Sequence, residues 1–259
     1  GDVYKRQQPD SEALLAIAIR NGYCLRSDAI GMNNAEWGYN SWEKAFARTW
    51  NYKLPILMEG GWIVGQHSYW NDDKKYRKDH PEDVRQGEFD DSKEARVNMM
   101  DFRVGDETES WFKTSFNLVK RFIAEGGYRL YPDKVSLPSA IKGGQTATIG
   151  HRWRNIGWGY LPNNLQQWNY KYKVAFALLN NNGEPVQVFV DKECEPSQWQ
   201  EGNPYDYRLN VSPSVSAGEY TWGVAIVNTK NDNKPGIKLA LSSKPAQSGW
   251  IALSKVRVD

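Results

Sequence analysis

Cysteine is nearly absent from this chain of 259 residues, which contains only Cys24 and Cys194. The two lie 170 positions apart, so the sequence offers neither a disulfide framework nor the paired spacing of a structural zinc site. Cysteine usage therefore leaves open whether the protein works in a reducing or an oxidising compartment.

Long apolar runs and an excess of one charge are missing as well. No stretch approaches the roughly 18 apolar residues that a membrane-spanning helix needs, and the mean hydropathy is −0.72. Thirty-three Lys and Arg are interspersed with thirty-one Asp and Glu, which leaves a net charge of +2. We therefore expect no membrane span and no nucleic-acid partner.

Several catalytic motifs are also absent. The glycine pairs at 143–144 and 157–159 lack the lysine and the strand-to-helix setting of a phosphate-binding loop. There is no Gly-x-Ser-x-Gly elbow and no His-Glu-x-x-His helix, which argues against serine hydrolases and zinc proteases. Asp72-Asp73 matches no standard calcium loop. We expect no metal and no cofactor, and paired carboxylates remain the best-supported chemistry.

Aromatic residues are plentiful, with twelve Trp and fourteen Tyr. Large aromatic rings with a polar edge suit stacking against flat, partly polar partners such as sugar rings. The alternative is that these residues belong to the core and the sheets. Carbohydrate is accordingly the partner that composition favours.

Residues 1–10 are interpreted as a non-native or disordered leader. The segment Gly1-Asp-Val-Tyr-Lys-Arg-Gln7 resembles the translated adaptor remnant found at the ends of metagenomic assemblies, and no initiator Met precedes it. We therefore expect the chain to be an N-terminally truncated metagenomic fragment.

Residues 11–127 alternate short apolar strands with helical stretches. Strands are predicted at 23–26, 54–58 and 97–102, and helices at 11–21, 41–50 and 110–124. This repetition predicts parallel strands covered by helices. Because three such strands alone make a poor sheet, we predict about the last three units of a (β/α)8 TIM-type barrel, with the N-terminal half of the barrel missing.

Residues 128–259 change character and contain only strand-like runs. The turns between them are rich in Gly, Asn, Pro and Ser. Seven short strands are predicted, at 146–153, 172–179, 186–190, 205–211, 220–227, 237–241 and 250–258. This spacing predicts an antiparallel immunoglobulin-like β-sandwich, so the expected fold class is α/β plus all-β.

Polar side chains follow the predicted parallel strands, where barrel active sites are built. Arg26 and Asp28 follow the first strand, Glu59 follows the second, and Asp101 and Arg103 lie around the third. Glu59 is the strongest candidate for a catalytic carboxylate, because Gly60-Gly61 comes directly after it and leaves room for a ligand. The alternative is a structural glutamate that pairs with Arg26 or caps the next segment.

The segment after Glu59 is long and aromatic, with Trp62, His67, Tyr69 and Trp70 within twelve residues. Long loops that carry aromatic residues often form a lid on which substrate stacks. Local packing is the alternative. A lone His more often hydrogen-bonds a ligand than carries a proton, so we expect His67 to bind substrate.

Four segments, Gly22–Gly31, Leu54–Gly60, Tyr128–Pro132 and Trp153–Trp158, together resemble the bacterial family called domain of unknown function 4832. That resemblance implies the C-terminal part of a glycoside-hydrolase-like barrel with an appended sandwich. The chain is also similar to the retaining glycosidases of clan A, which implies Glu59 as the nucleophile and an acid/base glutamate upstream of residue 1. The fragment alone is then expected to be inactive, and its parent to be secreted, periplasmic or at the cell surface.

Two functions remain open at this stage. In the first, the parent hydrolyses a glycosidic bond through Glu59, with Arg26, Asp28, Asp101 and the residues of the 62–70 segment binding substrate. In the second, the protein is a non-catalytic glycan-binding or cell-surface scaffold, whose sandwich presents Trp153, Trp158, Tyr160 and Trp168. A second carboxylate facing Glu59 would favour the enzyme.

Overall fold

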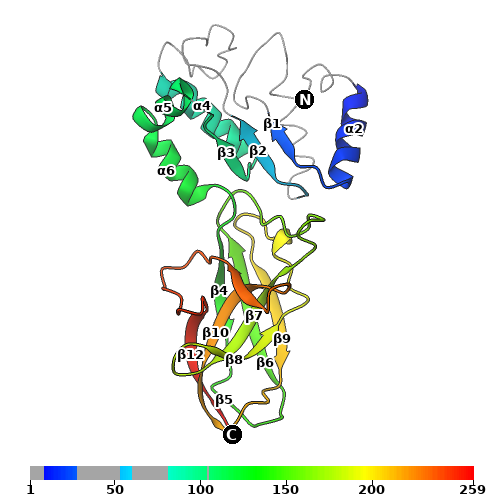
Figure 1. Ribbon diagram of the computed structural model, residues 1–259, viewed down its shortest axis with the longest axis vertical. Coiled ribbons are helices and arrows are strands. Elements are labelled where there is room, and N and C mark those ends of the chain that lie inside the picture. Colours follow the sequence, from blue (N-terminus) through cyan, green and yellow to red (C-terminus); the bar gives the residue numbers. More distant parts are fainter. Residues whose placement is uncertain (1–8, 28–52, 60–80, 104) are drawn as a thin grey trace. The chain divides into compact units, whose positions relative to one another are not determined.

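The computed structural model describes residues 9–27, 53–59, 81–103 and 105–259 (Figure 1). The chain divides into two compact units. Unit 1 comprises Gly1–Tyr128 together with Gly157–Pro162, and unit 2 comprises Arg129–Ile156 and Asn163–Asp259. The short segment 157–162 lies between two stretches of unit 2 in the sequence but is part of unit 1 in the structure.

Unit 1 contains a small parallel sheet and four described helices. Its sheet has the order β1-β2-β3, and Glu59 at the end of β2 is in register with Asp101 at the end of β3. The elements are α2 (Pro9–Arg20), β1 (Leu25–Ser27), β2 (Ile56–Glu59), α4 (Pro81–Glu94), β3 (Met99–Asp101), α5 (Asp106–Lys113) and α6 (Phe116–Glu125). The carboxyl ends of the three strands thus lie along one edge of the sheet.

The core of unit 1 forms around Met58, Phe89, Trp111 and Trp158, all 1% exposed or less. Trp158 comes from the 157–162 segment. Its indole Nε1 donates a hydrogen bond of 2.8 Å to the carbonyl oxygen of Val97, and its ring packs edge-on against Phe89. Burying such a large side chain stabilises the unit, and the hydrogen bond removes the cost of burying its polar N–H.

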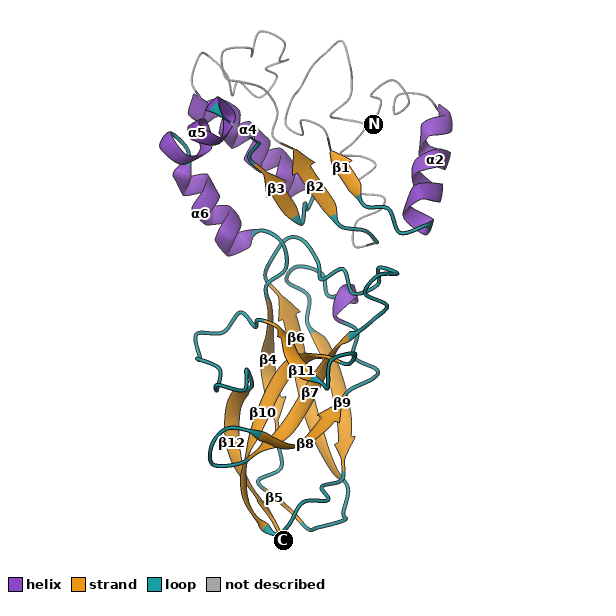
Figure 2. Cartoon of the chain, in the orientation of Figure 1, coloured by secondary structure: helices purple, strands orange, loops and turns teal. Residues whose placement is uncertain are grey.

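Unit 2 consists of two sheets, and the helical element drawn within it is the short 3-10 turn η2 at Pro196–Gln198 (Figure 2). The smaller sheet is antiparallel, with the order β4-β6-β9, and the larger has the order β5-β12-β10-β7-β8, with β11 paired to β10. Every pair in the larger sheet is antiparallel except β5 with β12. The strands are β4 (Leu130–Ser136), β5 (Ala140–Ile141), β6 (Ala147–Asn155), β7 (Tyr172–Leu179), β8 (Pro185–Val190), β9 (Tyr205–Val211), β10 (Gly218–Asn228), β11 (Lys234–Ile237) and β12 (Ile251–Val258), with a 3-10 turn η2 at Pro196–Gln198.

Strand β6 shows how the sequence directs its side chains. Ile149, His151 and Trp153 are buried, whereas the intervening Gly150 and Arg152 are partly exposed. This alternation is the two-residue period of a strand with one face in the core. Consequently the apolar and aromatic residues of β6 lie inside, and its arginines face outward.

The predicted fold class is wrong. The chain is mostly β-sheet, and no portion of a (β/α)8 barrel is evident in the described ranges. The three parallel strands span only three, four and three residues. Local hydrophobic patterns indicate strands and helices, but any small parallel sheet covered by helices produces the same pattern. The fold therefore gives no support to the similarity with clan A glycosidases that implied Glu59 as the nucleophile.

Individual helices also differ from expectation. The stretch predicted as one helix at 110–124 contains α5 and α6, which are separated at Thr114-Ser115. Thr114 Oγ1 donates to the carbonyl oxygen of Ser110, a local bond that competes with continuation of the helix. The helix predicted at 41–50 lies outside the described residues. Within the described ranges, no helix combines the length and the apolar character needed to cross a membrane.

Candidate functional site

A carboxylate held by two arginines lies where β2 ends. Glu59 is 9% exposed, and its Oε1 lies 2.6 Å from Arg26 Nη2 and 3.3 Å from Arg103 Nη1. Arg26 comes from β1 and Arg103 follows β3, so both strands that flank β2 contribute. The two guanidinium groups compensate the buried charge and fix the orientation of the carboxylate.

Arg103 also connects Glu59 to a second carboxylate. Its Nε lies 3.1 Å from Oε2 of Glu107 in the first turn of α5. Its backbone has a φ of 55°, a conformation that is uncommon for a residue with a side chain. The backbone N–H of Arg103 donates to Oδ1 of Asp101, and Thr108 Oγ1 donates to the carbonyl of Arg103. These bonds hold Arg103 between the two glutamates.

Glu107 has an altered acidity. Its side chain is 9% exposed, and burial raises the pKa of its carboxyl, an effect that the nearby Arg103 and Arg85 oppose and that Glu88 and Glu59 reinforce. A buried carboxylic acid keeps its proton to higher pH because desolvation disfavours the charged form. A buried carboxylic acid whose pKa is raised next to charged side chains is a candidate for proton transfer.

Behind Glu107 lies a fully buried ion pair between Arg85 and Glu88 of α4. Arg85 Nε donates to Ser110 Oγ over 2.7 Å, and its guanidinium lies 5.4 Å from the ring centre of Trp111. These contacts attach α4 to α5. The rigid support this provides keeps Glu107 in place. We refer to Arg26, Glu59, Asp101, Arg103 and Glu107 as the Glu59 cluster.

The structure brings three of the predicted site residues together. Glu59 and Arg26 are in direct contact, and Asp101 is in register with Glu59 on the neighbouring strand. Glu107 was not predicted, because the sequence does not reveal burial. The remaining predicted site residues, Asp28, Trp62, His67, Tyr69 and Trp70, lie outside the described residues.

Most of the aromatic residues that a binding scaffold was expected to expose are buried. Trp153, Trp158 and Tyr160 are 1% exposed or less, and only Trp168 of that set is partly exposed. Trp153, Trp158 and Tyr160 are therefore core residues, and these three offer no stacking surface for a sugar.

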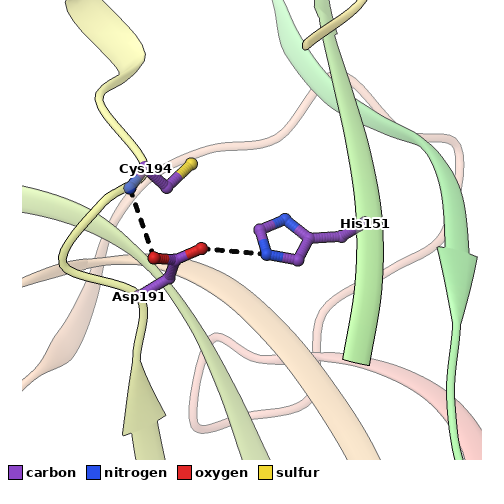
Figure 3. A group of neighbouring side chains, drawn as sticks. All are labelled: His151, Asp191 and Cys194. Atoms are coloured by element: carbon purple, nitrogen blue, oxygen red, sulfur yellow. Dashed lines mark hydrogen bonds and ion pairs between the residues drawn. The ribbon is translucent and has the colours of Figure 1, made fainter. Parts of the chain in front are cut away.

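A second group of chemically capable side chains is buried in unit 2 (Figure 3). His151 on β6 points toward Asp191, with Nε2 3.0 Å from Oδ2, and Cys194 lies beside them. Potential ligand atoms of the three residues lie within 4.8 Å of one another. The other carboxylate oxygen of Asp191 accepts the backbone N–H groups of Glu193 and Cys194. Such a group of His, Asp and Cys suggests a metal site.

The hydrogen bond on the far side of the imidazole argues against a metal. Trp153 Nε1 donates to His151 Nδ1 over 2.9 Å, and an indole nitrogen is only ever a donor. Nδ1 is therefore unprotonated, so the neutral imidazole carries its proton on Nε2, the nitrogen that would bind the ion. Oδ2 lies off the direction of that N–H, so the contact is close but poorly aligned. Burial and the neighbouring Asp191 also raise the pKa of the Cys194 thiol well above its usual range. The three residues do not fit a metal ion.

Comparison with known proteins gives little to interpret. No family model matches the chain, and no curated protein matches it. A CARDB domain of the PF1109 protein from Pyrococcus furiosus is 13% identical, over 51% of this chain and 93% of that chain, with a TM-score of 0.30. A beta-glucosidase from Listeria innocua is 11% identical, with a TM-score of 0.26, over 51% of this chain and 16% of its own length. A Niemann-Pick type C2 protein from the Japanese carpenter ant is 10% identical, over 51% of this chain and 91% of that chain, with a TM-score of 0.27. Likenesses this weak carry no conclusion about function.

Proposed function

We propose that the chain belongs to a carbohydrate-active protein that hydrolyses a glycosidic bond at the Glu59 cluster. The observation that carries this proposal is that one guanidinium, that of Arg103, contacts two carboxyl groups in different environments. Glycoside hydrolysis needs such a pair, one carboxylate that attacks or activates water and one acid that protonates the leaving oxygen. An exported location goes with this proposal.

Glu59 suits the nucleophile. Arg26 and Arg103 both make their closest contact with Oε1, and neither of these contacts uses Oε2. In the proposed step, a Glu59 oxygen forms a bond to the anomeric carbon as the bond to the leaving oxygen breaks. Water then cleaves the glycosyl-enzyme ester and returns Glu59 to its carboxylate form.

Glu107 suits the acid. Burial raises the pKa of its carboxyl, so it holds the proton that the leaving oxygen requires. After that transfer it is a carboxylate and takes a proton from the incoming water, which restores the starting state. Arg26 and Asp101, with Asp28, Trp62, His67, Tyr69 and Trp70, are proposed to bind the sugar.

Covalent labelling tests the role of Glu59. Activated 2-deoxy-2-fluoroglycosides with a dinitrophenolate leaving group trap a nucleophile without needing an acid, because the leaving group departs unprotonated. We expect intact-mass analysis to show one added glycosyl unit, and peptide mapping to place it on Glu59. The Glu59→Gln variant should stay unlabelled, and the control Glu109→Gln, which changes an exposed glutamate on α5, should label normally. Failure to label Glu59 across gluco, galacto, manno and galacturono configurations of both anomers would reject this role.

The pH dependence tests Glu107. Because its pKa is raised, the proton needed for catalysis is present below that pKa and lost as the pH increases through it. We expect kcat/KM to fall on the alkaline side, and Glu107→Gln to remove that limb. The variant should lose about 10²–10⁴-fold on a glycoside with a poor leaving group but little on a dinitrophenyl glycoside. Equal losses on both substrates would show that Glu107 is not the acid.

A non-catalytic glycan-binding protein is the second candidate. The close contact between Arg26 and Glu59 favours it, since the same geometry serves a structural ion pair. Saccharide binding without any labelling of Glu59 would support this candidate over the hydrolase.

A further inference from the structure

A groove of about 510 Å³ lies on unit 2. None of its residues belongs to the Glu59 cluster, which is part of unit 1. The volume of the groove falls within the range of about 300–1,000 Å³ typical of small-molecule sites. Residues of β4, β6 and β9 line it: Lys134, Ser136, Gly150, His151, Arg152, Asp206, Tyr207 and Arg208. We call it the β6 groove.

Two cross-strand rows form the polar walls of the β6 groove. In the first row Lys134, Arg152 and Asp206 are in register. In the second row Ser136 and Arg208 lie in register on either side of Gly150. Partners in register point to the same side of a sheet, so each row presents its side chains together. All but the central glycine are polar or charged.

Gly150 provides the space at the centre of the groove. It lies in the middle of β6, where it lacks the positive φ that would explain a glycine. A Cβ built there would meet only the Cβ of Ser136, at 3.6 Å, which is an ordinary contact. A side chain is therefore sterically allowed at this position, and it would project into the groove. The fold would tolerate a side chain at position 150, but the groove stays open only because this residue is glycine.

The groove carries uncompensated positive charge. Arg152 Nε donates to Oδ1 of Asp206 over 2.9 Å, and this bond lowers the pKa of the Asp206 carboxyl. That pair is neutral as a whole. The side chains of Lys134 and Arg208 make no hydrogen bond or ion pair with another side chain in the described part of the chain, although the charge of Lys134 also lowers the pKa of the Asp206 carboxyl. Two cations thus remain available to an anionic ligand.

We propose that the β6 groove binds an acidic oligosaccharide whose sugars carry carboxylate groups. Lys134 and Arg208 pair with the carboxylates, and Ser136 and Asp206 hydrogen-bond the hydroxyl groups between them. A phosphate polyanion such as an oligonucleotide fits less well, because it offers few free hydroxyl groups for Ser136 and the Asp206 carboxylate to hydrogen-bond. This inference deepens the proposed function by naming a substrate class, and its site is separate from the Glu59 cluster.

Titration calorimetry of the full chain with oligogalacturonate tests the proposal, with cello-oligosaccharide as the neutral probe. We expect oligogalacturonate alone to bind, and its affinity to fall with added salt because the exposed charges are screened. Gly150→Val, which fills the groove and suits a strand, should weaken binding at least about tenfold. Arg208→Ala should weaken it as well. Lys255→Ala, which removes an exposed cation on β12, is the matched control and should bind as the unmodified chain does.

The outcomes separate this site from the hydrolase proposal. Thermal melting and far-ultraviolet circular dichroism must show that Gly150→Val stays folded. Unchanged binding by folded Gly150→Val, or equal binding of the neutral probe, would overturn the inference. Stronger binding of an oligonucleotide than of oligogalacturonate would also overturn it. Glu59→Gln should bind oligogalacturonate normally, so a failure of labelling at Glu59 leaves the groove intact.

Discussion

Replacing Trp158 by alanine should destabilise unit 1 by about 3–5 kcal/mol, the usual cost of removing a buried tryptophan. The ring is 1% exposed and packs against Phe89 and Phe122, so its removal leaves a large cavity. The substitution also takes the hydrogen-bond donor away from the carbonyl oxygen of Val97. Because domains are only marginally stable, a loss of this size approaches the total stability of unit 1.

Urea unfolding of the full chain measures this effect. A chain with two units is expected to show two transitions, and Trp158→Ala should move only one of them to lower urea. Trp168→Ala is the matched control, since that tryptophan is partly exposed and belongs to unit 2. A change below about 1 kcal/mol for Trp158→Ala would show that the 157–162 segment contributes little to the core of unit 1.

Much of unit 2 is predictable from the sequence because its strands are defined locally. The runs predicted at 172–179 and 205–211 coincide with β7 and β9, and that at 146–153 overlaps β6 from its first residue, Ala147. Each is a regular pattern that ends at turn-forming residues, so no distant contact is needed to find it. The run predicted at 237–241 is displaced, since β11 spans Lys234–Ile237 and includes Pro235. A proline inside a short edge strand was interpreted as a turn.

The prediction of a barrel was wrong because closure of a sheet depends on contacts between distant parts of the chain, which local patterns do not show. A short apolar strand looks the same in a barrel and in an isolated parallel sheet. The unusual number of aromatic residues was misleading for a related reason. Trp153, Trp158 and Trp222 are all buried, and the indole N–H of each donates a hydrogen bond within the protein. Composition counts such residues without showing whether they face the core or a ligand.

The candidate site was partly predictable. Glu59 and Arg26 were found because the carboxyl ends of parallel strands meet at one edge, and the two side chains do touch. Glu107 was missed, although it lies four residues after Arg103, a spacing at which opposite charges pair on a helix. That spacing is common on exposed helices, so it gives no sign of burial or of a raised pKa. Only the packing of α4 against α5 makes Glu107 unusual.

The contact between His151 and Asp191 is a buried polar contact that could serve either function or structure. His151 lies on β6 and Asp191 directly follows β8, so the contact connects the smaller sheet to the larger one. Asp191 also accepts two backbone N–H groups, and His151 accepts the Trp153 indole. The hydrogen bonds of Asp191 Oδ1 and His151 Nδ1 thus have a structural role within unit 2, while His151 Nε2 and Asp191 Oδ2 face each other at 3.0 Å without an aligned hydrogen bond.

Replacing His151 by leucine should destabilise unit 2 by about 2–5 kcal/mol, because it leaves the buried Asp191 carboxylate without the neutral imidazole beside it, and an unsatisfied buried polar group costs about 1–3 kcal/mol or more. The Trp153 indole loses its acceptor in the same change. Asp191→Asn should cost about 1–3 kcal/mol, since the amide oxygen still accepts the backbone N–H groups but the amide nitrogen then faces the Nε2–H of His151, a donor against a donor. Both effects are measured by urea unfolding of the full chain. Because the Trp153 bond holds the proton of His151 on Nε2, adding zinc or EDTA should leave the melting temperature unchanged. A zinc-dependent rise that His151→Leu abolishes would show that the imidazole binds metal, and the assignment of its proton would then be wrong.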